Sequence, residues 1–266
     1  MTKDERLALI CQHLYSHGES TIQTIAEVAD ASLATVRRDL LSLEADGTIH
    51  RTHGGARIAK SAGVEVAFDL RENQNLFAKR AIADLAYEQI AAGSTIFLDA
   101  GTTVLQLARR LRLNPMPLSV FTNCLNTAQV LMNTPDIKVI LLGGQLRAEN
   151  SSMVGALAEA MIENLWFDQL FLGAGAIAPD ACIYSLDASE AQLNQKMLAR
   201  AGSTLLLVDS SKFGQCLTYR VAPLDKPLTV ISDEQLSASW WARLRERGCI
   251  TLQASSQGIT TQDAQA

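Results

Sequence analysis

The sequence lacks the residue patterns that mark several protein classes. Its five cysteines lie far apart and never form a C-x-x-C pair, which argues against a disulfide framework and against a zinc site. Its apolar stretches are broken before the ~20 residues that a bilayer crossing needs. The first residues, MTKDERLALICQHLYSHGE, do not have the pattern of a secretory signal. We therefore expect a soluble, cytoplasmic protein without a membrane partner.

Histidine is scarce, and its positions restrict the chemistry. All four histidines (13, 17, 50 and 53) lie near the N-terminus, so the most common general base is missing from the rest of the chain. Their spacing suits no metal site. A G-x-G-x-x-G fingerprint is also lacking, because Gly173-x-Gly175 has no third glycine at the right offset. We expect neither a metal nor another cofactor, and no catalytic residue.

The composition is that of a globular protein with two domains. The chain has 266 residues, of which 48% are hydrophobic and 19% are charged. Its net charge of −5 excludes a general basic coat for nucleic acid, so any DNA contact must be local. We expect an N-terminal domain over residues 3–58, a linker over 59–76, a larger domain over 77–253 and a polar tail over 254–266.

Three short helices and a hairpin are predicted in the N-terminal domain. Apolar residues recur at helical spacing over 7–14, 22–29 and 33–43, with Ser32 at the N-cap position of the third helix. The apolar stripe of this helix consists of Leu33, Val36, Leu40 and Leu43. Residues 48–57 alternate around a Gly-Gly turn, as in a small β-hairpin. This order is that of a winged helix-turn-helix.

The outward side of the third helix suits DNA. Ala34 keeps the helix slim enough for a groove, and Thr35 can contact phosphate or a thymine methyl group. Arg37 and Arg38 can bind phosphate or guanine. In the hairpin, or wing, Arg51 and Arg57 are candidate phosphate contacts. An arginine pair on a helix is more often simply solvated, so the face alone leaves both interpretations open.

The sequence of this segment favours the DNA-contacting interpretation of the helix face. Residues 32–56, SLATVRRDLLSLEADGTIHRTHGGA, resemble the DeoR family of bacterial repressors, whose helix and wing read V-S-x-x-T-I-R-R-D-L-x-x-L-E-x-x-G and R-x-H-G-G-A. Ala31 and Val36 replace the usual Val and Ile. The resemblance implies that Asp39 is structural and anchors neighbouring backbone or an arginine. The DNA-contacting residues it implies are Ser32, Ala34, Thr35, Arg37, Arg38, His50, Arg51, His53 and Arg57.

Strands and helices alternate along the larger domain. Strands are predicted at 94–99, 118–122, 137–142, 168–172, 203–208, 228–231 and 249–253. Helices are predicted from Phe77 to Gly93 and at 102–112, 124–133, 155–165, 188–201 and 233–247. This alternation predicts an α/β domain with a mostly parallel sheet and helices on both faces.

Small and polar residues follow the predicted strands, where open α/β sheets bind ligands. Asp99-Ala100-Gly101-Thr102-Thr103 joins a strand to a helix, and its N–H groups and hydroxyls can cradle a phosphate. Plain N-capping by the threonines explains the same turn. Cys124, beside Asn123, is either an effector-site thiol or a small buried hydrophobe.

These turns also resemble the sensor domain of the DeoR family. The matching segments are LDAGTT (98–103), TN (122–123), GG (143–144), GALA (155–158), FLGAG (171–175), SEAQLNQKM (189–197) and DSSKFG (209–214). That domain is similar in fold to ribose-phosphate isomerases, glucosamine-phosphate deaminases and CoA transferases, and its usual ligands are sugar phosphates or related metabolites. The effector-binding residues implied are Gly101, Thr102, Thr103, Thr122, Asn123, Gly143, Gly144, Gly175, Glu190 and Lys212.

Two details of this assignment stay open. Asp187 precedes Glu190 by three residues, so a capping box explains Glu190 as well as a ligand contact does. Many relatives carry Lys four positions after Glu190, whereas this chain has Asn194, with Lys196 nearby.

The resemblance implies a homo-oligomeric repressor of a carbohydrate-metabolism operon, a dimer or tetramer that a phosphorylated sugar releases from double-stranded operator DNA. The alternative is a sugar-phosphate isomerase or deaminase, which the missing histidines disfavour.

Overall fold

The structure is a computed structural model that describes residues 2–45, 48–52, 54–58, 68–224 and 228–255. The chain divides into two compact units, Met1–Gln74 and Asn75–Ala266. Residues 59–67 of the predicted linker, residues 256–266 of the predicted tail and His53 fall outside the described residues. Within the described ranges no helix is both long and apolar enough to cross a membrane.

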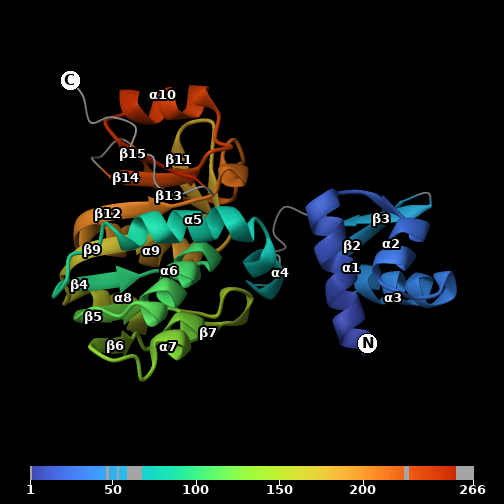
Figure 1. Cartoon of the computed structure of the whole chain (residues 1–266), viewed down its shortest axis with the longest axis horizontal. Coiled ribbons are helices and arrows are strands. Elements are labelled where there is room, and N and C mark those ends of the chain that lie inside the picture. Colours follow the sequence, from blue (N-terminus) through green and yellow to red (C-terminus); the bar gives the residue numbers. More distant parts are fainter. Residues whose placement is uncertain (1, 46–47, 53, 59–67, 225–227, 256–266) are drawn as a thin grey trace. The chain divides into compact units, whose positions relative to one another are not determined.

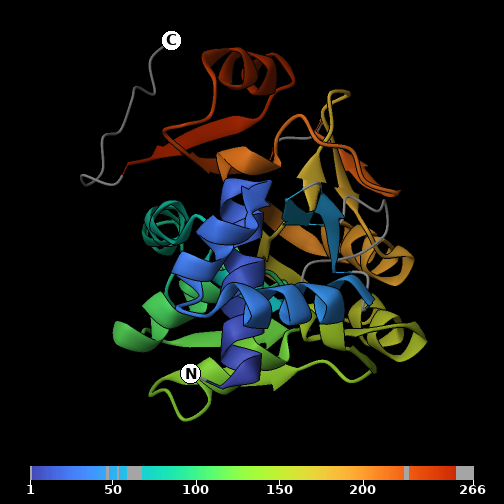
Figure 2. The same cartoon turned by 90° about the vertical axis from the view of Figure 1, so that its right-hand side faces the viewer.

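The N-terminal unit is a winged helix-turn-helix, drawn in blue in Figures 1 and 2. Its helices are α1 (Lys3–His17), α2 (Ile22–Val28) and α3 (Leu33–Ala45). Its antiparallel sheet has the order β1-β3-β2, formed by β1 (Ser20–Thr21), β2 (Ile49–Thr52) and β3 (Gly55–Ile58). The three helices and the hairpin confirm the prediction. Residues 68–73, within the predicted linker, form a further short helix, α4 (Phe68–Asn73).

The core of this unit is apolar and joins all three helices to the hairpin. Its buried residues include Ile10, Leu14, Ile25, Val36, Leu40 and Ile49. Leu33, predicted in the same stripe, is instead 42% exposed. It is the first residue of α3, and its side chain lies at the end of the helix outside the packed cluster.

A buried ion pair fixes α3 to α1. Asp39 accepts hydrogen bonds from Arg6 in a fork, at 2.6 Å from Nε to Oδ2 and 3.2 Å from Nη2 to Oδ1. Asp39 is almost wholly buried, so the guanidinium neutralises a carboxylate that would otherwise lie unpaired inside the domain. This confirms the structural role that the resemblance implied for Asp39.

The larger unit is built on seven parallel strands in the order β15-β14-β12-β9-β4-β5-β6 (Figure 1). Their bounds are β4 (Thr95–Leu98), β5 (Leu118–Thr122), β6 (Ile137–Leu141), β9 (Phe167–Leu172), β12 (Ala201–Leu207), β14 (Thr229–Asp233) and β15 (Ile250–Ala254). Each corresponds to a predicted strand.

Two apolar clusters, one on each side of the sheet, hold the helices. One contains residues of α5 (Leu76–Tyr87), α6 (Thr102–Leu113) and α7 (Leu125–Leu131). The other contains residues of α8 (Ala156–Glu163), α9 (Ala188–Ala199) and α10 (Ala238–Glu246). Helices therefore cover both faces, as predicted.

The structure adds small elements that the sequence did not predict. The segment between β6 and α8 forms a hairpin of β7 (Gln145–Arg147) and β8 (Ser152–Val154), joined by the 3-10 turn η1 (Ala148–Asn150). A separate sheet has the order β10-β11-β13, from β10 (Ala176–Ile177), β11 (Cys182–Ser185) and β13 (Tyr219–Pro223). A second 3-10 turn, η2 (Ser210–Lys212), follows β12.

The close approach of Gly55 to β1 can be tested by substitution. A Cβ atom at Gly55 would overlap the carbonyl oxygen of Ser20 across the β1–β3 pairing. We expect Gly55→Ala to destabilise the N-terminal unit by about 1–3 kcal/mol, because the backbone must move to relieve the overlap. Thermal unfolding followed by circular dichroism measures this change. All three tryptophans (166, 240 and 241) lie in the larger unit, so their fluorescence transition is the internal control. Unchanged unfolding of the helical N-terminal unit would contradict the prediction.

Candidate functional site

The outward face of α3 is the first candidate site. Ser32 caps the helix, because its Oγ accepts from the N–H of Thr35 at 3.2 Å. Ala34, Arg37 and Arg38 are exposed, and Arg38 Nε lies 3.4 Å from the carbonyl oxygen of Ala34. Leu41 on the same helix is 51% exposed. The face therefore offers two cations, a hydroxyl and a small residue, while Asp39 is turned inward.

The wing carries its polar residues on β2 and β3. His50 and Arg57 are direct cross-strand partners, and both are exposed. Arg51 lies near the end of α3, with Nη1 3.9 Å from Glu44 Oε2. A loose, exposed pair of this kind contributes little and leaves the guanidinium available. Among the predicted wing contacts, His53 lies outside the described residues.

The second candidate site lies where the parallel strands of the larger unit end, at an edge we call the rim. Because all seven strands run in one direction, their carboxyl ends share this edge. The loop after β4 contains Asp99 and Gly101, and the loop after β9 contains Gly173. These loops touch, since the Gly173 N–H donates to Asp99 Oδ2 at 3.1 Å. The structure thus brings separate predicted motifs together.

Gly101 and the two threonines begin α6. The N-cap is Gly101, so neither threonine occupies the capping position. Thr102 and Thr103 are both buried within the first turn. The N–H groups of this turn and the helix dipole favour an anion at this point. The geometry therefore leaves the threonine hydroxyls available for a ligand rather than committing them to a cap.

The end of β5 supplies a buried amide. Thr122 Oγ1 accepts from the Cys124 N–H at 3.0 Å, which fixes the turn. Asn123 is only 1% exposed, and its Oδ1 has no hydrogen-bond partner within the part of the chain that the structure describes. An unpaired buried oxygen is unfavourable, so it marks a place where a ligand donor would be stabilising. Cys124 is buried and burial raises the pKa of its thiol, which supports its interpretation as a small hydrophobe.

The remaining predicted glycines lie close to other backbone segments. A Cβ at Gly144 would come 2.7 Å from the carbonyl oxygen of Val154 in β8. One at Gly175 would come 2.8 Å from Leu217 Cδ1 and 3.0 Å from the carbonyl oxygen of Tyr184. The Gly143 N–H lies 3.2 Å from Met161 Sδ. Close packing thus accounts for Gly144 and Gly175 without a ligand.

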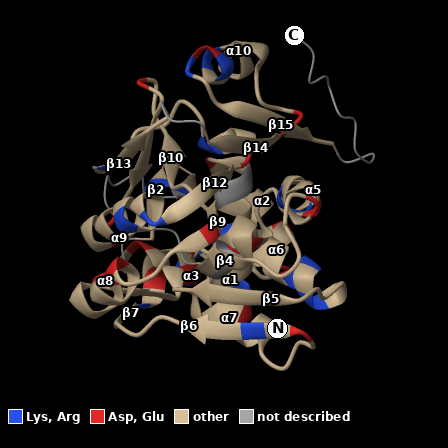
Figure 3. Cartoon of the chain, turned by 90° about the vertical axis from the view of Figure 1, so that its left-hand side faces the viewer, with Lys and Arg blue, Asp and Glu red and all other residues tan. Residues whose placement is uncertain are grey.

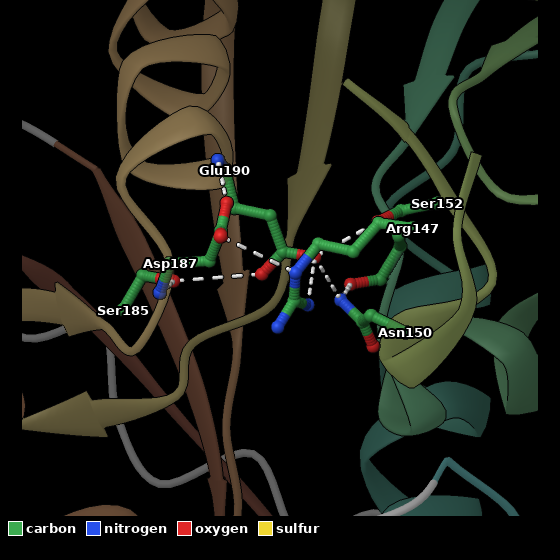
Figure 4. Close-up of polar contacts among 7 residues, drawn as sticks. Arg147, Asn150, Ser152, Ser185, Asp187 and Glu190 are labelled. Atoms are coloured by element: carbon green, nitrogen blue, oxygen red, sulfur yellow. Dashed lines mark hydrogen bonds and ion pairs between the residues drawn. The ribbon is translucent and has the colours of Figure 1, made fainter. Parts of the chain in front are cut away.

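Glu190 is the centre of the polar contacts at the rim (Figure 4). Its Oε1 accepts from Arg147 Nη1 at 2.9 Å, from Asn150 Nδ2 at 2.8 Å and from Ser152 Oγ at 2.8 Å. All three donors come from the β7–β8 hairpin. Asp187 caps α9 by accepting from the Glu190 N–H at 2.9 Å, whereas the Glu190 side chain turns to the hairpin. Asp187 therefore caps the helix, but the reciprocal Glu190 contact of a capping box, which the sequence left open, is not formed.

Lys212 lies at a different part of the rim, at the end of η2. Next to it, Asp209 accepts from Asn75 Nδ2 at 2.9 Å, which ties the start of α5 to the end of β12. Lys79, one turn into α5, is buried. Arg147, Asn150, Ser152 and Lys79 were not predicted from the sequence. The signal present for the first three was a mostly polar segment, 147–152, shortly after the Gly-Gly motif.

Lys196 does not stand in for the lysine that Asn194 replaces. It forms ion pairs with Glu159, at 3.3 Å, and with Glu163, both on α8. Figure 3 colours acidic residues red and basic residues blue on α8 and α9. Lys196 therefore links α9 to α8 through these ion pairs. The described residues contain no cluster of three or more His, Cys, Asp or Glu side chains that could hold a metal.

Two sets of comparisons place the chain among known proteins. Residues 6–62 match the model of the DeoR-like helix-turn-helix domain, and residues 74–234 match that of the DeoR C-terminal sensor domain. The chain is 36% identical to the HTH-type transcriptional regulator GlpR of Haloferax volcanii, covering 90% of this chain and 92% of that protein. It is 35% identical to the transcriptional repressor CsqR of Escherichia coli, covering 91% of each.

The chain is also similar to a sugar-system repressor and, in part, to an isomerase structure. The chain is 35% identical to the lactose phosphotransferase system repressor of Lactococcus lactis, covering 89% of this chain and 93% of that protein. Ribose 5-phosphate isomerase A of Methanocaldococcus jannaschii matches 51% of this chain and 53% of its own, at 17% identity and a TM-score of 0.37.

Asp99 yields a prediction about stability and pH. Burial, followed by the negative charge of Glu190, raises the pKa of Asp99 from 3.8 to about 7. The folded protein then binds the proton more tightly than the unfolded chain does, so the free energy of unfolding falls as pH rises between these values. The slope reaches about 1.4 kcal/mol per pH unit for one proton.

Asp99→Asn removes this titration and keeps an acceptor oxygen. We expect the variant to gain stability relative to the wild type as pH rises from 5 to 8. Urea unfolding, followed by tryptophan fluorescence at each pH, measures the difference. Parallel stability curves for the two proteins would rule out the proposed state of Asp99.

Proposed function

Because the chain belongs to the DeoR family of transcriptional regulators, we propose that it represses a carbohydrate-metabolism operon and leaves its operator when a sugar phosphate binds the rim. The observation that carries this function is the pairing, in one chain, of a winged helix-turn-helix with an exposed arginine face and a parallel α/β domain with a polar rim. The name of the L. lactis relative refers to a sugar system, which supports a carbohydrate ligand.

The DNA-contacting residues are proposed from the geometry of α3 and the wing. Arg37 and Arg38 lie on an exposed helix face, as base or phosphate recognition requires. Arg57 and His50 extend this polar surface along the wing. Ser32, Ala34, Thr35, Arg51 and His53 complete the proposed contact set. A symmetric homo-oligomer would present two such faces to an operator with two half-sites.

The effector residues are proposed in two groups. Gly101, Thr102 and Thr103 would hold the phosphate at the start of α6. Asn123 and Glu190 border this turn, and the unpaired Asn123 Oδ1 would accept a hydrogen bond from a ligand hydroxyl. Thr122, Gly143, Gly144 and Gly175 would shape the surrounding loops, and Lys212 would offset negative charge. The packing of Gly144 and Gly175 makes their role that of backbone placement.

Catalysis is the competing function, and one observation favours it. A buried carboxyl whose pKa is about 7, as burial and Glu190 make that of Asp99, is suited to general acid–base chemistry. However, Asp99 accepts from the Gly173 N–H and is 3% exposed, so its place is a support between two loops. We therefore propose that the domain binds its sugar phosphate without turnover.

The DNA half is tested by Arg38→Ala. We expect operator affinity to fall by about tenfold to a hundredfold, since one arginine contact to a base or phosphate is worth about 1–3 kcal/mol. Fluorescence anisotropy with DNA from upstream of the gene measures affinity at fixed salt. Arg245→Ala, an exposed arginine on α10, is the matched control and should bind as the wild type does. Equal affinity of both variants would refute the proposed face.

The effector half is tested by a panel of glucose 6-phosphate, fructose 6-phosphate, fructose 1-phosphate, galactose 6-phosphate and glycerol 3-phosphate. One of these should weaken DNA binding while the compound is recovered unchanged. Thr102→Val removes a hydroxyl at nearly constant volume, so it should raise the concentration needed for release by about tenfold. Thr134→Val, equally buried but before β6 at the opposite edge of the sheet, should have no such effect. Turnover of a sugar phosphate would favour the enzyme instead.

A further inference from the structure

Two carboxylates, those of Asp99 and Glu190, lie near each other at the rim, and a third, that of Asp187, shares Arg147 with Glu190. Asp99 directly follows β4, Asp187 caps α9, and Glu190 lies in the first turn of α9 (Figure 4 draws the last two). Glu190 is near enough to Asp99 that its negative charge adds to the effect of burial on that carboxyl. Asn150 spans the gap between them, because its Nδ2 contacts Glu190 Oε1 at 2.8 Å and the carbonyl oxygen of Ala100 at 3.3 Å.

Positive charge in this cluster is shared. Arg147 is paired with Glu190 at 2.9 Å and with Asp187 at 3.5 Å, so one guanidinium serves two carboxylates. Asp99 is instead stabilised by the backbone N–H groups of Gly173 and Ala100 and by the Asn123 side chain. These neutral dipoles offset burial only in part, and the pKa of Asp99 stays near 7.

An anion at the start of α6 would lie next to this cluster. Gly101, the N-cap of α6, follows Asp99 by two residues in the chain. The first turn of a 12-residue helix attracts an anion, and the unpaired, buried Asn123 Oδ1 is a second sign of a ligand there. A phosphate dianion at this point would repel an ionised Asp99.

We propose that binding of a sugar phosphate at the rim is coupled to uptake of one proton from solvent by the Asp99–Glu190 carboxylate pair. This inference rests on the proposed function, since it concerns the same ligand. The proton bonds to a carboxylate oxygen, and no other bond changes. Binding therefore weakens as the solution becomes alkaline.

The groups facing Asp99 support this assignment. Glu190 approaches from α9, Asn123 and the Cys124 thiol from the end of β5, and the Gly173 N–H from the end of β9. Burial raises the pKa of Cys124, which keeps this thiol neutral. The guanidinium of Arg147, from β7, keeps its charge throughout the range studied. Glu190 Oε1 already accepts three hydrogen bonds from the hairpin, whereas Asp99 lies buried among neutral donors, so Asp99 is the group that takes the proton.

The experiment is calorimetric titration of the full-length protein with the sugar phosphates named above, in Hepes and in Tris at pH 8. These buffers differ in ionisation enthalpy, so the difference in binding heat gives the number of protons taken up. The phosphate of the ligand is a dianion at this pH, since its second pKa is about 6. We expect about 0.5–1 proton per ligand, and an affinity that falls by up to about tenfold per pH unit above pH 7.

Asp99→Asn should bind without proton uptake and should bind more tightly than the wild type at pH 8. Asp233→Asn is the matched control, because Asp233 is also a buried aspartate at a strand end but accepts from Ser210 instead. It should keep the uptake of the wild type. Wild-type binding with no proton uptake, or undiminished uptake by Asp99→Asn, would overturn the inference and leave the proposed function standing. Binding of none of the sugar phosphates would overturn both.

Discussion

The parallel direction of the seven strands determines where the larger domain can do chemistry. Each crossover returns the chain to the start of the sheet, through η2 and β13 between β12 and β14 and through an α-helix elsewhere, so every strand opens into a loop at the same edge. Asp99, Asn123 and Glu190 are far apart in the sequence, yet the sheet brings the first two to neighbouring strand ends and α9 carries the third to them. The N-terminal domain has no such edge, and its polar surface follows from the faces of one helix and one hairpin.

Periodicity was sufficient to locate the elements of the two cores. The helices and the seven strands were predicted because their apolar residues repeat at spacings set by local geometry. The β7–β8 hairpin was missed because its strands have three residues each and its polar residues reach outward: Arg147, Asn150 and Ser152 find Glu190 at separations of 43, 40 and 38 residues. For Glu190, the sequence suggested a local contact with the backbone of Asp187, three residues earlier. In the structure its side chain instead accepts hydrogen bonds from the distant hairpin.

The buried carboxylates at the rim destabilise the fold relative to an apolar packing of the same space. Glu190 alone is well compensated, because three donors meet one of its oxygens. Asp99 is not, since it lies buried beside that carboxylate with only neutral donors, and the pKa of Asp99 rises to about 7 as a result. Strongly shifted groups of this kind concentrate at functional sites. The unpaired Asn123 Oδ1 beside it indicates the same place.

The net charge of the chain limits how operator affinity can arise. With a net charge of −5, long-range attraction does not bring this protein to DNA, so affinity must come from a few placed cations. Arg6 keeps Asp39 inside the domain, which leaves Arg37 and Arg38 without an exposed acid at the neighbouring position. A tenfold change in operator affinity needs about 1.4 kcal/mol, which is the worth of one such arginine contact. If the proposed function holds, an effector that misplaced one such arginine would lower operator affinity by about tenfold.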